Sequence, residues 1–118
     1  MINVYDVYQK LHGNEKVDEF TKQLCREFLS RHPLKWIESF SKEYAAIDED
    51  GRNYVFIRNR DGKFFIREGC YFDGTFPLGL KVKTDSLAEA IESANEILRN
   101  VGFFVHPYNN LEPKNLAK

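Results

Sequence analysis

The chain has 118 residues, of which 42% are hydrophobic and 30% are charged, and its formal net charge at pH 7 is −1. This length fits one domain, and 10 Phe, 6 Tyr and 1 Trp supply enough apolar surface for a core. No apolar run approaches the ~20 residues of a membrane span, and no basic-then-apolar leader opens the chain, so we expect a cytoplasmic protein that does not enter a membrane.

Apolar residues at helical spacing predict two helices at the N-terminus, over residues 2–12 and 16–31. In the first helix, Val4, Tyr8 and Leu11 recur on one side. The second helix carries a stripe of four apolar residues: Val17, Phe20, Leu24 and Phe28. We expect both stripes to face the core.

Pro33 fits the first turn of a third helix, where its missing N–H would have no partner in any case. The apolar stripe of this helix would consist of Leu34, Ile37, Phe40 and Tyr44. Residues 44–48 either finish this helix or begin a first short strand, and we favour the strand.

Three Asp-Gly pairs punctuate the middle of the chain: Asp50-Gly51, Asp61-Gly62 and Asp73-Gly74. Asp-Gly between alternating residues is a strong hairpin signal, because Gly accepts a positive φ and Asp tolerates one. The pattern predicts an antiparallel meander with strands over 53–60, 63–72 and 78–84.

A two-residue loop at Asp61-Gly62 would fix the register of the central hairpin. Arg60 then faces Lys63, Arg58 faces Phe65 and Phe56 faces Arg67, and successive side chains point to opposite faces of the sheet. The apolar face carries Val55, Ile57, Phe64, Ile66 and Cys70. The opposite face carries Tyr54, Phe56, Arg58, Arg60, Lys63, Phe65, Arg67 and Tyr71. The last strand is expected to add Leu80 and Val82 to the first face and Lys81 and Lys83 to the second.

Ser86 and Glu89 form a capping-box pattern, which predicts a helix from there to about Arg99. Gly102 suits the end of this helix, and residues 101–105 are apolar enough for a short final strand. From Pro107 onward the composition predicts a poorly ordered tail. The fold class is therefore α+β: N-terminal helices, a three- to four-stranded antiparallel meander, and a C-terminal helix packed on it. These elements form one domain over 1–106, with a flexible tail over 107–118.

The positive charge of the chain is concentrated in the predicted sheet. Residues 51–84 hold 7 Lys/Arg and 3 Asp/Glu, a net charge of +4, against −3 for residues 1–50 and −2 for residues 85–118. Nucleic-acid-binding proteins use cations to neutralise phosphates and aromatic rings to stack on bases. The candidate binding residues are Tyr54, Phe56, Arg58, Arg60, Lys63, Phe65, Arg67, Lys81 and Lys83.

Two purely structural interpretations of this face stay open. In one, Arg58 with Phe65 and Arg67 with Phe56 are cross-strand cation–π pairs on a solvated surface. In the other, the N-terminal helices lie on the face and bury the rings.

In topology, residues 52–100 resemble the three-stranded sheet and following helix of AP2 domains and of the arm-binding domains of recombinases. Three strands followed by Thr84-Asp85-Ser86-Leu87-Ala88-Glu89-Ala90 fit that outline. The resemblance covers less than half of the chain and carries no residue assignments.

No pattern in the sequence indicates catalysis, a metal or a cofactor. Asp48-Glu49-Asp50-Gly51 suggests a calcium loop, but the frame of such a loop fails at two ligand positions, so we expect an acidic turn. Cys25 and His32 lie seven residues apart and lack a third, orienting group. Cys25 and Cys70 are expected to be buried thiols, although a disulfide between them stays open. We therefore expect a protein that is not an enzyme.

Two functions remain as alternatives. The first is nucleic-acid binding through the basic and aromatic face of the sheet. The second is a protein-binding inhibitor, immunity protein or mobile-element (phage or plasmid) antagonist that blocks another macromolecule, since aromatic residues and Arg also dominate protein interfaces. A homodimer formed through an exposed strand edge is compatible with both.

Overall fold

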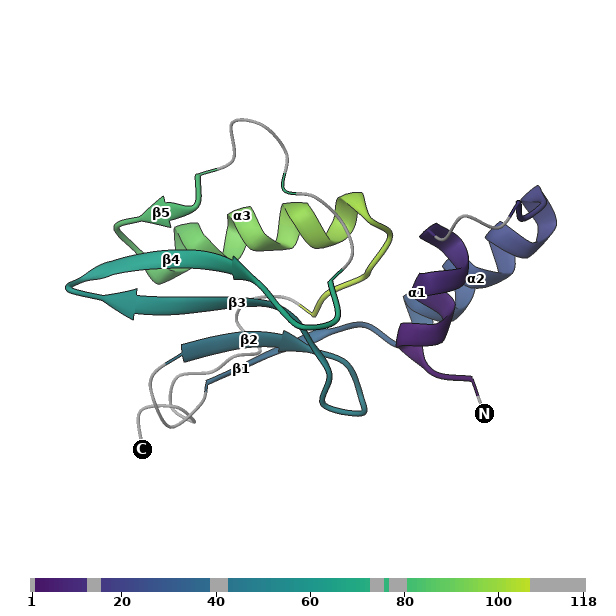
Figure 1. The fold of residues 1–118 in the computed structure, drawn as a ribbon, viewed down its shortest axis with the longest axis horizontal. Helices are drawn as coiled ribbons and strands as arrows, with labels where there is room; N and C mark the ends of the chain where they lie inside the picture. Colours follow the sequence, from purple (N-terminus) through teal and green to yellow (C-terminus); the bar gives the residue numbers. More distant parts are fainter. Residues whose placement is uncertain (1, 13–15, 39–42, 73–75, 77–80, 107–118) are drawn as a thin grey trace.

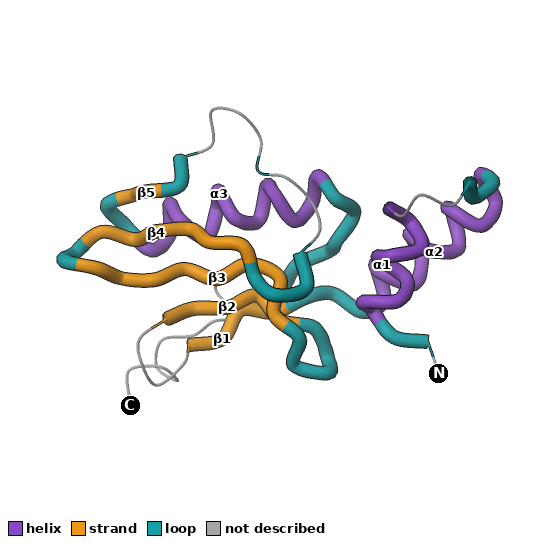
Figure 2. Tube along the Cα trace, viewed as in Figure 1, coloured by secondary structure: helices purple, strands orange, loops and turns teal. Residues whose placement is uncertain are grey.

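The protein is described by a computed structural model, which covers residues 2–12, 16–38, 43–72, 76 and 81–106. Within these residues it is an α+β fold of three helices and five strands (Figures 1 and 2). In chain order they are α1 (Val4–His12), α2 (Glu19–Arg31), β1 (Lys35–Glu38), β2 (Glu43–Ile47), β3 (Asn53–Arg60), β4 (Lys63–Glu68), β5 (Lys83–Thr84) and α3 (Leu87–Asn100).

The five strands form one antiparallel sheet in the order β1-β2-β3-β4-β5. Helix α3 lies along one face of this sheet, while α1 and α2 pair with each other beyond one end of it (Figure 1). We call the face under α3 the inner face. Its buried residues are Trp36, Ala46, Val55, Ile57, Ile66 and Thr84. Each fully buried aliphatic side chain there contributes about 1.5–3 kcal/mol of burial free energy.

The predicted hairpin register is confirmed. Arg60 pairs with Lys63, Arg58 with Phe65 and Phe56 with Arg67. Both loop residues have positive φ, 52° at Asp61 and 81° at Gly62, as a tight turn that matches the twist of the strands requires.

The helix starts that the sequence predicts near residues 16 and 86 are stabilised by side-chain caps. The Asp18 carboxylate accepts a hydrogen bond of 2.8 Å from the Thr21 backbone N–H at the start of α2. Ser86 Oγ accepts one of 3.0 Å from the Glu89 N–H at the start of α3, which confirms the position of the capping box. The bond to the Thr21 backbone N–H lowers the pKa of Asp18, because it favours the ionised carboxyl.

The predicted third helix is wrong. Residues 35–38 form strand β1, and 43–47 form β2, as favoured for residues 44–48. In β1, Trp36 is buried between exposed Lys35 and Ile37, which is the alternation of a strand. Trp36 Nε1 also donates a 2.8 Å hydrogen bond to Asn95 Oδ1 of α3, so a tertiary contact overrides the helical spacing of Leu34 and Ile37. The extra strand raises the count from three or four to five; Phe40 lies outside the described residues.

The strand expected over 63–72 ends early, at Glu68. The Gly69 N–H bonds the Tyr54 carbonyl at 2.8 Å, and a Cβ at Gly69 would lie 2.5 Å from Asn53 Oδ1, so the bend needs glycine. Beyond it Cys70 is exposed, not buried on the apolar face, while Cys25 is buried; both thiols are free.

The last part of the meander is short in the described chain. Strand β5 comprises only Lys83–Thr84, and residues 73–75 and 77–80, with the third Asp-Gly pair and Leu80, lie outside the described residues. Val82 is 43% exposed, although the alternation predicts it inward. The tail over 107–118 also lies outside them.

The final strand expected over 101–105 is a single parallel bridge between Leu34 and Val105. The Leu34 N–H donates to the Phe104 carbonyl at 2.7 Å, and the His106 N–H donates to the Leu34 carbonyl at 2.9 Å. This bridge attaches the segment after α3 to the start of β1. None of the helices in the described chain has the length and apolarity that crossing a membrane requires.

Candidate functional site

The basic and aromatic surface predicted from the sequence lies on the face of the sheet opposite α3. We call it the outer face. From the strand register, its residues in β1 to β5 include Lys35, Ile37, Glu43, Ala45, Phe56, Arg58, Arg60, Lys63, Phe65, Arg67 and Lys83. No helix of the described chain lies along this face (Figure 1). Phe56 and Phe65 are both half-buried. The N-terminal helices therefore do not bury these two rings.

The two rings lie close to cations, though in other pairs than expected. The Arg58 guanidinium carbon lies 5.9 Å from the Phe56 ring centroid, and Lys83 Nζ lies 5.9 Å from the Phe65 centroid. Both distances are within the range of cation–π attraction, which is about 0.5–1 kcal/mol at exposed sites. Each ring keeps part of its surface accessible.

Three of the predicted cations are paired with carboxylates of the same chain. Arg58 Nε donates a 2.6 Å hydrogen bond to Glu43 Oε2, and Lys63 Nζ donates to Asp85 Oδ1. The Lys63 hydrogen bond and positive charge lower the pKa of Asp85. Lys81 Nζ donates to Glu89 Oε2 of α3 at 3.1 Å, so Lys81 is held toward the helix and is not on the outer face.

The cations of the outer face that remain without a carboxylate partner among the described residues are Lys35, Arg60, Arg67 and Lys83. All four side chains are exposed. The outer face thus carries uncompensated positive charge around two partly accessible rings.

Tyr54 is a correction to the predicted site. Its side chain is fully buried, with its ring 6.0 Å from Tyr8 of α1 and 4.7 Å from Phe103. Its hydroxyl donates a 2.7 Å hydrogen bond to Asp48 Oδ2, and burial together with this bond raises the pKa of Tyr54 well above its usual value. Helix α1 packs against this end of the sheet, where its Tyr8 ring covers Tyr54, so Tyr54 cannot contact a partner.

The acidic turn before β3 is a structural element. Asp48 is buried, and its Oδ1 accepts hydrogen bonds from the backbone N–H groups of Asp50 at 2.9 Å and Arg52 at 3.0 Å. Arg52 Nη1 lies 2.9 Å from Asp50 Oδ2. In the described part of the chain, no group of three or more His, Cys, Asp or Glu residues is arranged to hold a metal ion.

His32 takes part in local contacts of the helix end. Its ring stacks on Phe28 with centroids 4.2 Å apart, and Nδ1 lies 2.8 Å from Glu49 Oε2. These contacts orient the imidazole towards the turn after β2.

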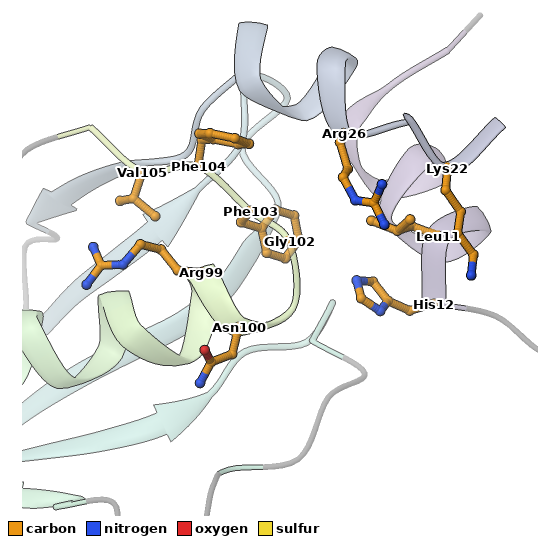
Figure 3. Close-up of a pocket in the computed structure, with 10 residues that line it drawn as sticks. All are labelled: Leu11, His12, Lys22, Arg26, Arg99, Asn100, Gly102, Phe103, Phe104 and Val105. Carbon is orange, nitrogen blue, oxygen red and sulfur yellow. The ribbon is translucent and has the colours of Figure 1, made fainter. Parts of the chain in front are cut away.

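A pocket that the sequence pattern did not predict lies between the helical pair and the segment after α3 (Figure 3). Its volume is about 710 Å³. Its lining residues are Leu11, His12, Lys22, Arg26, Arg99, Asn100, Gly102, Phe103, Phe104 and Val105. They come from the two N-terminal helices and from residues 99–105 near the other end of the described chain, so neither periodicity nor local spacing could identify them.

Comparison with known proteins finds no family model, no curated protein and no solved structure that matches the chain. The resemblance of residues 52–100 to AP2 and recombinase arm-binding domains is limited to the order of β3, β4, β5 and α3. Strands β1 and β2 extend the sheet beyond that outline.

Proposed function

We propose that this protein is a non-catalytic nucleic-acid-binding protein and that the outer face of its sheet is the binding surface. The observation that supports this proposal is the combination on one face of two half-buried rings, Phe56 and Phe65, with Arg60, Arg67 and Lys83, which pair with no carboxylate of the described chain. Free cations attract phosphates, and accessible rings offer a stacking surface to unpaired bases.

The proposed roles differ between the free and the paired cations. Arg60, Arg67 and Lys83 contact phosphates, because no ion pair must break for them to do so. Arg58 and Lys63 stay bonded to Glu43 and Asp85 and hold the surface in shape. Phe56 and Phe65 stack on bases, which favours single strands over a closed duplex.

The test is the binding of fluorescein-labelled single-stranded and duplex oligonucleotides, followed by fluorescence anisotropy at increasing salt. We expect single strands to bind more tightly than duplex at ~50 mM salt, where phosphate contacts are strong. In the Arg60→Gln/Arg67→Gln variant, the slope of log K against log salt should fall by about 0.7 for each phosphate that the variant no longer neutralises.

The matched control is Lys10→Gln/Arg31→Gln, which removes two exposed cations from α1 and α2 and leaves the outer face intact. An equal loss of affinity in both variants would show that the total charge acts, and not this surface. Absence of binding at the lowest salt would exclude the proposed function.

A second candidate is a protein-binding inhibitor or antagonist, and the exposed apolar residues of α2 favour it. The expectation that the apolar stripe of this helix faces the core is wrong for Phe20 and Leu24: they are 72% and 50% exposed, one helical turn apart. Large exposed apolar residues at this spacing are typical of helices that dock on a partner. A pull-down from host lysate with the wild type and with Phe20→Ser/Leu24→Ser tests it: a protein captured only by the wild type supports this candidate, and capture of nucleic acid alone contradicts it.

A further inference from the structure

The pocket between the helical pair and the segment after α3 combines an apolar floor with a basic rim. Phe103 is buried, with 3% exposed, and lies in the centre of the close-up, while Phe104 is 47% exposed (Figure 3). Leu11 and Val105 add aliphatic surface. A volume of about 710 Å³ is within the range of small-molecule sites in proteins.

The rim carries positive charge from both sides. Lys22 and Arg26 come from α2, whereas Arg99 stands on the far side of the segment that holds Phe103 (Figure 3). None of the described lining residues is acidic. Arg26 Nη1 lies 3.8 Å from Glu19 Oε2, and both side chains of that pair are largely exposed. An exposed ion pair of this kind contributes little to stability, so Arg26 can exchange Glu19 for an anionic ligand.

His12 has a different role, since its Nε2 donates to the Val101 carbonyl. This contact ties the end of α1 to the segment after α3 and so holds the two walls of the pocket together. The pocket is therefore an open recess, and its cations form no ion pair with the residues that line it.

We propose that this pocket binds a small organic anion with an apolar body, such as an aryl-alkyl carboxylate. The anionic group lies at Arg26 and Lys22, and the apolar body lies on the exposed ring of Phe104, with Leu11 and Val105 beside it. Arg presents two parallel N–H donors that match a carboxylate, which makes Arg26 the main anchor. This site lies beyond one end of the sheet and is separate from the outer face.

The test is a titration of the ¹⁵N-labelled protein with 4-phenylbutyrate, followed by amide chemical shifts. We expect saturable shifts at the amides of residues 102–105. The uncharged analogue 4-phenylbutan-1-ol and inorganic phosphate, which each lack one half of the ligand, should bind about tenfold more weakly or worse, because the first forms no charge-assisted hydrogen bond and the second buries no apolar surface.

Variants of α2 test whether Arg26 and Lys22 bind the anionic group of the ligand. Lys22→Gln/Arg26→Gln should weaken 4-phenylbutyrate binding by about tenfold or more and leave the alcohol unaffected, and Arg26→Lys should recover part of the loss. Arg31→Gln is the matched control, because it removes an exposed cation of the same helix that does not line the pocket. The proposal is overturned if the alcohol or phosphate binds as tightly as the carboxylate, if the double variant binds like the wild type, or if no saturable shift occurs. Oligonucleotide binding by the double variant distinguishes this site from the outer face, since it should be retained.

Discussion

The inner and outer faces of the sheet are built from alternate residues of the same strands, yet they differ in nearly every physical respect. On the inner face, Ile57 and Ile66 are buried against α3. On the outer face, their neighbours Phe56 and Phe65 keep partial exposure and lie among cations. Apart from Tyr54 at the end next to α1, the outer-face residues of β3 and β4 do not belong to the buried core, so most of that face is free of its packing constraint. Stability and binding should therefore be separable in this sheet by single substitutions.

The largest effect should come from breaking the inner face. Ile57→Ala removes a fully buried side chain from beneath α3 and should lower the free energy of unfolding by about 3 kcal/mol or more, because burial is reduced and a cavity forms. Its sequence neighbour provides the control: Phe56→Ala on the outer face should cost about 1 kcal/mol. Urea denaturation of both variants measures the contrast, and equal losses would show that the outer face is also part of the core.

The next effect concerns buried Asp48 in the turn that joins β2 to β3 at the end of the sheet. Asp48→Ala removes the acceptor of two backbone N–H groups and of the Tyr54 hydroxyl, and should cost about 2–3 kcal/mol. Asp50→Ala, which removes an exposed partner of Arg52, should cost less than about 1 kcal/mol. Thermal unfolding compares the two variants. An equal drop in Tm would show that the hydrogen bonds of buried Asp48 stabilise the fold no more than the exposed Asp50–Arg52 pair does.

A smaller effect should appear in alkaline solution. The pKa of Tyr54 is raised in the folded state, so the folded protein holds its proton more tightly than the unfolded chain. The resulting stabilisation is fully present below the ordinary tyrosine pKa of about 10 and is lost as pH rises above it. Tyr54→Phe should be less stable at pH 7 by about 1–2 kcal/mol but should lose less stability between neutral and alkaline pH. Parallel slopes for both proteins in denaturation at increasing pH would contradict this assignment.

The smallest effect should come from adding one unpaired positive charge to the outer face. Asp85→Asn removes the partner of Lys63 and adds one free cation to the surface, so oligonucleotide binding should tighten by about two- to threefold at low salt. Anisotropy titration measures the gain in affinity, and weaker binding by the variant would count against phosphate contacts at this edge.

The same ion pair should make stability depend on pH in acid. Because the pKa of Asp85 is lowered, the contribution of this pair to stability is present above the ordinary carboxyl pKa and is lost as pH falls through the lowered one.

The sequence predicts features whose causes are local. The Asp61-Gly62 turn sets the pairing of β3 with β4 through its own backbone geometry, and the cap at Ser86 depends on a residue three positions away. The same alternation sorts Phe56 and Phe65 onto one face. These residues could therefore be placed without knowledge of the rest of the fold.

Features that depend on distant contacts could not be predicted in this way. The segment around Trp36 is a strand, in which the indole N–H bonds Asn95 of α3. Tyr54 is buried because the rings of Tyr8 and Phe103 pack against it. Lys81 is drawn to the inner side by Glu89, a residue of the following helix. The pocket is the extreme case, because its walls come from both ends of the described chain.

The bridge between Leu34 and Val105 has a consequence for the dynamics of the chain. It joins two distant segments through one residue, since Leu34 donates to Phe104 and accepts from His106. Neither of these two hydrogen bonds can persist when the strand-like contact separates. In native-state hydrogen exchange, the amides of Leu34 and His106 should therefore open together, with one shared free energy, although they lie far apart in the sequence.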